Sequence, residues 1–237
     1  MLNPRNHGDG AWIYLAGLGG GLVSGDRYAV DVDAGRGVTA LISTQASTKV
    51  YRSSEGCSQT LRCSVADEGC LAVLPDPVVC FEGARYTQRI EIDLAPDASA
   101  ILLDGFTCGR SARGERWKFD RYESRSTLTR GGRVLFADAV RLDPAHGSLA
   151  ARMGRFEVFL SLLAIGPRVA AVRDSILRDT PSPGADDAAI AAASPIGADG
   201  AFLRVAGVSF EQASRLFRPS FAAMTELLGD DPFARKW

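Results

Sequence analysis

The sequence is poor in the residues that most metal sites and hydrolytic triads require. Only two histidines, His7 and His146, occur among 237 residues, so a histidine-rich metal cage is excluded and a Ser–His–acid triad has no recognisable motif. No C-x-x-C pair occurs among the five cysteines, which are Cys57, Cys63, Cys70, Cys80 and Cys108. The missing pair argues against structural zinc, and the odd number argues against a closed disulfide set. We therefore expect reduced thiols, several of them in the core.

Long hydrophobic runs and a large net charge are also missing. The longest uncharged apolar run, Val158 to Gly166, is far shorter than the roughly 20 residues of a membrane-spanning helix. The N-terminal MLNPRNHGDG lacks the apolar core of a secretory signal. A formal net charge of −1 argues against a protein that coats nucleic acid or an anionic membrane. These features predict a soluble, cytoplasmic protein.

An internal repeat is the most informative pattern that is present. The three copies are VDVDAGRGVTALIST from Val30, LRCSVADEGCLAVLPD from Leu61 and IEIDLAPDASAILLDG from Ile90. Each copy predicts a strand, a short turn and a second strand. The turns open at Ala34, Ala66 and Ala95. Such units stack because each covers the apolar face of its neighbour. We expect a mainly-β fold of stacked β-hairpin layers, a β-solenoid or sandwich-like body; an ordinary sandwich meander would space its strands equally evenly.

The character of the chain changes near its C-terminal third. We expect one domain over residues 1–237, with the β-rich body over about 11–165 and a helix over 167–178. Residues 180–200 are rich in Pro, Ala, Asp and Gly and predict a loop. A strand and a second C-terminal helix are expected over 201–229, and Pro219 should kink or split that helix.

Three carboxylates interrupt apolar positions of predicted strands. Alternation places Asp26 and Asp138 on apolar strand faces, and Asp104 interrupts the run AILLDGF. A carboxylate in a core is costly unless it is paired, protonated, metal-bound or in contact with internal water. The three acids could line an oxygen-rich passage for a divalent cation. Alternatively each pairs with one of the 24 arginines or caps a turn, or two of them form the catalytic pair of a β-solenoid carbohydrate hydrolase.

Three sequence blocks together resemble the urease accessory protein UreD family, called UreH in some bacteria. These are GGGLVSGD (19–26), TQASTKVYRS (44–53) and CGRSARGERW (108–117), followed by Arg235 and Trp237 at the C-terminus. The glycine block lacks the His-Pro-Pro that many bacterial members carry before it, and in this it is more similar to the plant and fungal form. The signature positions, structural or partner-facing, are Gly20, Gly21, Gly25, Thr44, Gln45, Lys49, Tyr51, Arg52, Gly109, Arg110, Gly114 and Glu115.

The resemblance implies a chaperone-type accessory protein without enzymatic activity. It implies a β-rich fold with two helices near the C-terminus, and partners that are UreF-like and UreG-like accessory proteins and the urease apoprotein, with no nucleic acid or membrane. No tightly bound cofactor is implied, only nickel(II) in transit through an internal tunnel. The tunnel positions of the family correspond to Asp26, Thr48, Asp104 and Asp138, and the three acids among them would be transient metal ligands. If this resemblance is set aside, a plain β-rich binding module remains an alternative. We also expect Arg110 and Glu115 to form an ion pair that holds the turn of the third block.

Overall fold

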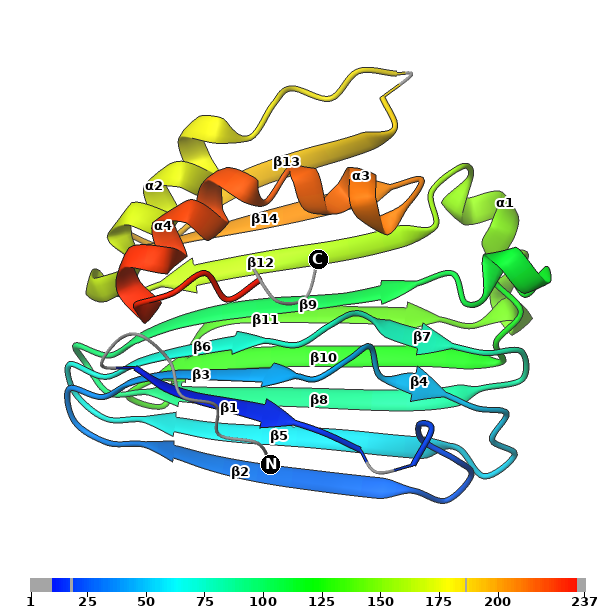
Figure 1. Cartoon of the computed structure of the whole chain (residues 1–237), viewed down its shortest axis with the longest axis horizontal. Helices are drawn as coiled ribbons and strands as arrows, with labels where there is room; N and C mark the ends of the chain where they lie inside the picture. Colours follow the sequence, from blue (N-terminus) through cyan, green and yellow to red (C-terminus); the bar gives the residue numbers. More distant parts are fainter. Residues whose placement is uncertain (1–9, 18, 186, 234–237) are drawn as a thin grey trace.

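Two facing β-sheets form the body of the protein, and helices cover one of them (Figure 1). The computed structural model describes residues 10–17, 19–185 and 187–233. The large sheet contains β1 (Ala11–Leu15), β3 (Thr39–Thr44), β4 (Lys49–Val50), β6 (Cys70–Leu74), β7 (Val78–Cys80), β9 (Ser99–Thr107), β12 (Val158–Ile165), β13 (Ala189–Ile196) and β14 (Gly200–Gly207). The small sheet contains β2 (Arg27–Ala34), β5 (Cys57–Val65), β8 (Arg85–Leu94), β10 (Arg121–Arg130) and β11 (Arg133–Leu142).

The three sequence repeats form three stacked coils. In each coil the first strand lies in the small sheet and the second in the large sheet, so β2, β5 and β8 pair in parallel, as do β3, β6 and β9. The turns also stack, with Ala66 N donating to Ala34 O and Ala95 N to Val65 O, both at 2.9 Å. This confirms the mainly-β, solenoid-like fold. Since the two strands of one repeat lie in different sheets, each copy connects the sheets instead of pairing with itself.

The chain then leaves the coiled pattern. β10 and β11 form an antiparallel hairpin, and β12, β14 and β13 extend the large sheet in antiparallel fashion. Our prediction of a loop over 180–200 is wrong in part, because it contains β13, which pairs with β14. The alanine-rich sequence AIAAASPI has little intrinsic strand preference, and a tertiary partner decides its conformation.

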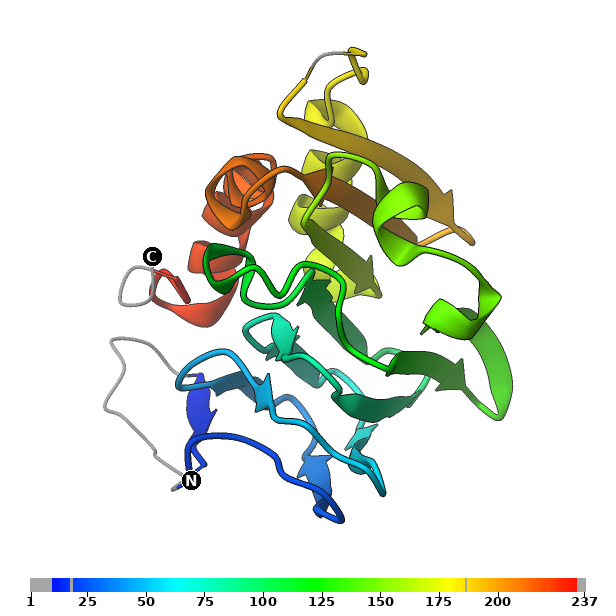
Figure 2. The same cartoon turned by 90° about the vertical axis from the view of Figure 1, so that its right-hand side faces the viewer.

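Helices pack on the outer face of the large sheet. They are α2 (Ala170–Asp179), α3 (Phe210–Arg215) and α4 (Arg218–Leu228), preceded by a 3-10 turn at Pro167–Val169. A short α1 (Leu149–Met153) packs elsewhere, through Leu149 against an aromatic cluster, and further 3-10 turns lie at Ser111–Arg113 and Pro144–His146. The segment predicted as one helix is divided into α3 and α4, and Pro219 lies in the first turn of α4, where its missing N–H costs no bond. Figure 2 shows α2, α3 and α4 gathered along one side of the large sheet.

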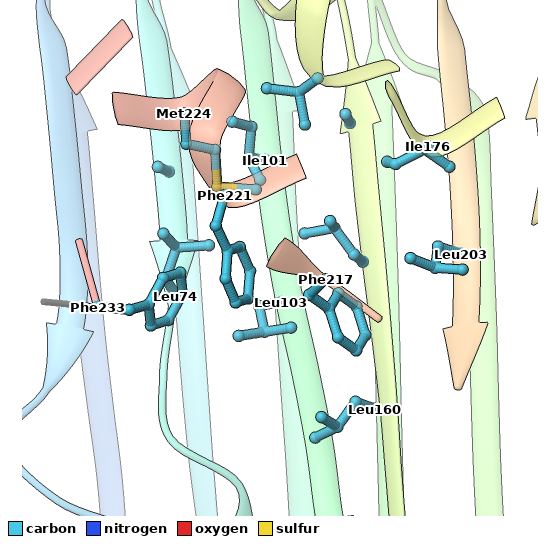
Figure 3. Packing of buried hydrophobic residues seen from close by; sticks show 14 of the residues in the cluster. Leu74, Ile101, Leu103, Leu160, Ile176, Leu203, Phe217, Phe221, Met224 and Phe233 are labelled. Atoms are coloured by element: carbon cyan, nitrogen blue, oxygen red, sulfur yellow. The ribbon is translucent and has the colours of Figure 1, made fainter. Parts of the chain in front are cut away.

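An aromatic and aliphatic cluster joins the helices to this sheet (Figure 3). Phe217 and Met224 are fully buried and lie over Leu74, Leu103 and other side chains of the sheet. The Trp12 indole N–H donates to Leu228 O at 3.2 Å and so ties β1 to the end of α4. No helix among the described residues has the length and apolarity that crossing a bilayer requires.

Candidate functional site

The space between the two sheets changes character along the strands. At the turn end, β8 contributes Ile90, Ile92 and Leu94 to an aliphatic cluster. At the opposite end Tyr86 belongs to an aromatic cluster. Between these clusters lies Gln88, which is 7% exposed. The interior therefore has a polar zone between two apolar ones.

Strand register gathers the polar side chains in this zone, which we call the polar belt. On the small sheet, Gln88 is aligned with Gln59 and Ser124. On the large sheet, Asp104 and Arg204 are each aligned with Ser161 between them. The polar belt is defined by these six residues.

Asp104 is the centre of the polar belt. One carboxylate oxygen accepts from Gln88 Nε2 at 2.8 Å and from its own neighbour Gly105 N at 2.9 Å, and the other accepts from Ser124 Oγ at 2.9 Å. Burial raises the pKa of this carboxyl, while the three hydrogen bonds oppose the rise, and Asp138 adds a smaller like-charge contribution. Asp104 forms no ion pair with any arginine or lysine in the described part of the chain. Its charge is therefore stabilised by neutral donors only.

Tyr86 extends the network toward the aromatic cluster, where its ring lies beside that of Tyr122. The Tyr86 hydroxyl donates to Gln88 Oε1 at 3.1 Å and lies 3.2 Å from Gln59 Oε1. The Tyr122 hydroxyl is buried and has no hydrogen-bond partner among the described residues. Burial raises the pKa of both phenols, so both remain protonated at physiological pH.

A cavity opens beside Asp104. It offers about 30 Å³ to the centres of water-sized molecules, and a single water needs roughly 10–15 Å³ on that measure. Its polar lining includes Thr44, Thr48, Asp76 and Gln88. Thr44 Oγ1 and the Asp76 carboxylate are 3.0 Å apart, and Asp76 N donates to Thr44 Oγ1 at 2.8 Å. The structure thus brings two of our four tunnel candidates, Thr48 and Asp104, to one cavity large enough for water.

Asp138 lies at the far end of the polar belt. Alternation correctly places it on the inward face of β11 with Phe136. Its carboxylate is 2.7 Å from the Arg204 guanidinium, and its side chain is 24% exposed. The arginine-pairing alternative therefore describes this acid.

Asp26 is outside the cavity, contrary to our prediction of an interior position. It precedes the first residue of β2 and is partly exposed. Its carboxylate accepts from Val23 N at 2.9 Å, and Asp26 N donates to Val23 O at 3.1 Å. Periodicity assigned the correct side of the strand, but the residue belongs to a turn at a sheet edge. Asp26 caps that turn.

The signature residues of the glycine and threonine blocks pack against one another. Leu22 N donates to Lys49 O at 2.8 Å and Tyr51 N donates to Leu22 O at 2.9 Å. A Cβ on Gly21 would lie 2.3 Å from Lys49 O, so only glycine permits this approach. Lys49, Tyr51 and Arg52 are exposed above this contact. Of the other positions, Gly25 is a turn residue, Thr44 is the last residue of β3, and Gln45, which follows it, donates its N–H to Leu15 O at 3.0 Å.

The third signature block closes on itself through Arg110 and Glu115, as we expected. The Arg110 Nε donates to Glu115 Oε2 at 2.8 Å, and Arg110 Nη2 donates to the other oxygen, so the pair is bidentate. The guanidinium also lies 3.9 Å from the centre of the Phe81 ring. Gly109 and Gly114 have positive φ on either side of the turn.

We predict that Glu115→Gln destabilises the protein in a pH-dependent way. The hydrogen bonds from Arg110 hold the pKa of Glu115 below its ordinary range. A lowered folded-state pKa contributes stability above the unfolded-state value, and this contribution is lost as the pH falls through the folded value. The unfolding midpoint of Glu115→Gln should therefore lie below that of the wild type at pH 7, and the two should converge well below pH ~4. Urea titrations of the variant and the wild type at pH 7 and well below pH ~4 test this. If the two unfolding midpoints differ equally at both pH values, the prediction is contradicted.

Several members of the polar belt were not predicted from the sequence. Gln88 and Ser124 occupy inward positions between aromatic and aliphatic neighbours, so the alternation that located Asp138 could have found them too. In the described ranges, no three His, Cys, Asp or Glu side chains form a group able to hold a metal ion. His7, Arg235 and Trp237 lie outside the described residues.

Comparisons with known proteins agree on one family. A family model described as UreD urease accessory protein matches residues 1–237. The chain is 52% identical over 237 residues to a urease accessory protein UreD of Sorangium cellulosum (strain So ce56), covering 100% of this chain and 76% of that protein. It is 46% identical over 239 residues to a UreD of Anaeromyxobacter sp. (strain Fw109-5), covering 99% and 80%. It is 33% identical over 251 residues to urease accessory protein D of Oryza sativa subsp. indica, covering 94% and 82%.

Proposed function

The chain belongs to the UreD family of urease accessory proteins, and from this premise we propose that it is a maturation scaffold that conducts nickel(II) toward apo-urease through the polar belt. Membership of the family assigns the chain a role in urease maturation, and it makes the chain an accessory protein and not an enzyme. The route of the metal and the identity of the partners are the proposal.

The partly buried Asp104 carboxylate beside a water-sized cavity is the observation that carries this proposal. It is held by Gln88, Ser124 and Gly105, and within the described ranges it forms no ion pair. A divalent cation passing the cavity would meet the carboxylates of Asp76 and Asp104 together with hydroxyl and amide oxygens. Such an oxygen set attracts nickel(II) but binds it more weakly than imidazole or thiolate sites do. Weak binding suits a cargo that must leave.

The partner proposal rests on exposed signature residues. Lys49, Tyr51 and Arg52 are solvent-exposed, and Tyr51 is 38% exposed although its ring packs edge-on against Phe81 at 5.0 Å. We propose that this surface contacts a UreF-like accessory protein, which in turn recruits a UreG-like GTPase. An exposed aromatic side chain flanked by cations is typical of protein interfaces.

The hydrolase alternative receives no support from the geometry. Asp104 lies between the sheets, Asp26 closes a turn and Asp138 pairs with Arg204. A glycosidase requires two carboxyl groups that flank a sugar at an accessible groove. None of the three acids has the exposure and freedom for that role.

Omission of the chain tests the proposed function. Urease structural genes are expressed in nickel-containing medium with the complete accessory set, and then without this chain. We expect the same amount of urease protein in both cases, with nickel content and specific activity lost in the second. Nickel per urease active site, measured by plasma mass spectrometry on purified urease, is the readout. Normal nickel content without the chain would refute the role in nickel delivery.

A further inference from the structure

The edge of the small sheet offers a strand that lacks a second neighbour. β5, β8 and β10 each pair on both sides, whereas β2 pairs only with β5 in the described part of the chain. In Figure 1, β2 forms the lower border of the molecule. An unpaired edge of this length is a template for another strand.

The backbone phase of β2 identifies the groups that are available. Ser58 N donates to Asp26 O at 2.9 Å and Ala66 N donates to Ala34 O at 2.9 Å. Even-numbered residues of β2 therefore direct their carbonyls toward β5. Since N–H and C=O of one strand residue point the same way, the odd-numbered residues direct theirs away from the sheet. These residues are Arg27, Ala29, Asp31 and Asp33.

We propose that two copies of this chain associate through antiparallel pairing of β2 with β2, about a two-fold axis at Val30. In this register Arg27 faces Asp33 of the second copy and Ala29 faces Asp31 of the second copy. All four outward residues then form hydrogen-bonded pairs. The proposal goes beyond urease maturation, since it concerns association of the chain with itself.

Charge complementarity and the number of hydrogen-bonded pairs together select this register over its neighbours. Moving the partner by two residues in one direction places Asp31 opposite Asp31, and like charges directly opposite are unfavourable. The opposite movement places Ala29 opposite itself and loses one hydrogen-bonded pair. Only the register at Val30 satisfies the four outward residues and pairs both Arg27 side chains with carboxylates. One oxygen of Asp33 already accepts from Ser64 Oγ, which fixes the carboxylate for this contact.

The inward face of β2 gives the pairing an apolar component. Tyr28 is 53% exposed, and Val30 and Val32 are only partly buried against the aliphatic cluster. In the proposed dimer Tyr28 lies opposite Val32 of the second copy, and Val30 lies opposite Val30. The end of a stacked-coil body needs such a cover, because each coil buries its apolar face only against a neighbour.

Engineered cysteines test the register. Facing residues in a non-hydrogen-bonded antiparallel pair have Cβ atoms close enough for a disulfide. Val30→Cys should therefore yield a covalent dimer under mild oxidation, whereas Ala29→Cys and Asp31→Cys, the matched controls, should not. The background is low because all five native cysteines are buried, and burial raises the pKa of Cys57 and Cys63 on neighbouring β5 to about 11 and about 12. Cross-linking of Ala29→Cys or Asp31→Cys in place of Val30→Cys would overturn the register.

Charge exchange tests the association itself. By sedimentation velocity, the wild type should show a concentration-dependent dimer, and Arg27→Asp or Asp33→Arg should raise its dissociation constant roughly tenfold or more, since two facing pairs become repulsive. An equimolar mixture of the two variants should dimerise again, because both facing pairs are then complementary. Asp93→Arg makes the same change on β8 of the same sheet and should leave the dimer intact. A monomeric wild type at every concentration, or a mixture that stays monomeric, would overturn the proposal.

Discussion

Urease matured in the presence of Asp104→Asn should contain little nickel. At an effective dielectric constant of about 20, a unit charge ~4 Å from a carboxylate gains about 4 kcal/mol. Removing that carboxylate should lower the occupancy of a cation in the cavity ~100-fold or more. We therefore expect urease activity to fall roughly tenfold or more. Asparagine has nearly the same shape and keeps an acceptor for Gln88 Nε2 and Gly105 N, so the fold should persist.

The matched control is Asp26→Asn. It removes one carboxylate of the same type from a turn that lies outside the cavity, so urease activity should remain at the wild-type level. Co-purification with the UreF-like protein distinguishes a defect in nickel passage from a defect in complex assembly. Both variants should still co-purify with that protein. If Asp104→Asn matures urease normally, the conduit is refuted; if it loses its partner, Asp104 acts in folding or docking instead.

Asp104 should also make stability depend on pH. Its pKa is raised in the folded protein by burial, so the folded state binds the proton more tightly than the unfolded chain does. The resulting stability is complete below the unfolded-state pKa of about 3.9 and is lost as the pH rises through the folded-state value. Asp104→Asn should lack this loss of stability with rising pH. In urea titrations at acidic and neutral pH, the free energy of unfolding should therefore differ less between the two pH values for the variant than for the wild type. If this difference between acidic and neutral pH is the same in the variant and the wild type, burial does not raise the pKa of Asp104.

Local sequence signals predicted the stacked β layers, but they did not predict the position of every candidate acid. The repeated alanine-opened turns specified three coils because each copy carries the same alternation and turn. For Asp104 alternation was ambiguous, since both faces of β9 are apolar. Its hydrogen bonds to Gln88 and Ser124 of the small sheet show that it faces inward with Leu102. The prediction of an interior position for Asp26 was wrong because a strand pattern does not reveal where the strand begins or that it lies at the edge of a sheet.

Neutral polar residues were harder to find than charged ones. Gln88 and Ser124 carry no charge, and an isolated glutamine or serine in a strand has a low cost if it is exposed. Their importance comes from register, which places them opposite Asp104 on a different sheet. Contacts between residues 16 and 20 positions apart across two sheets are tertiary information, which the periodicity of one strand does not contain.

Phe217→Ala should cause the largest loss of stability among these substitutions. Phe217 is 0% exposed, lies between α3 and α4, and stacks on Phe221 with ring centroids 5.7 Å apart (Figure 3). Truncating a buried phenylalanine costs about 3–5 kcal/mol, a large part of the roughly 5–15 kcal/mol available to a folded domain. Because this ring holds both helices against the large sheet, the urea midpoint should fall strongly while the slope of the transition stays unchanged.

The conservative variant Phe217→Leu retains most of the apolar volume and should lose about 1.5 kcal/mol or less. Intrinsic fluorescence and circular dichroism should then report one common transition, since the helices and the sheet share one core. A separate early loss of helical signal in Phe217→Ala, with the sheet transition unmoved, would mean that the helices are a detachable layer. In that case the large sheet would be stabilised mainly by its contact with the small sheet, through the aliphatic cluster that also borders the polar belt.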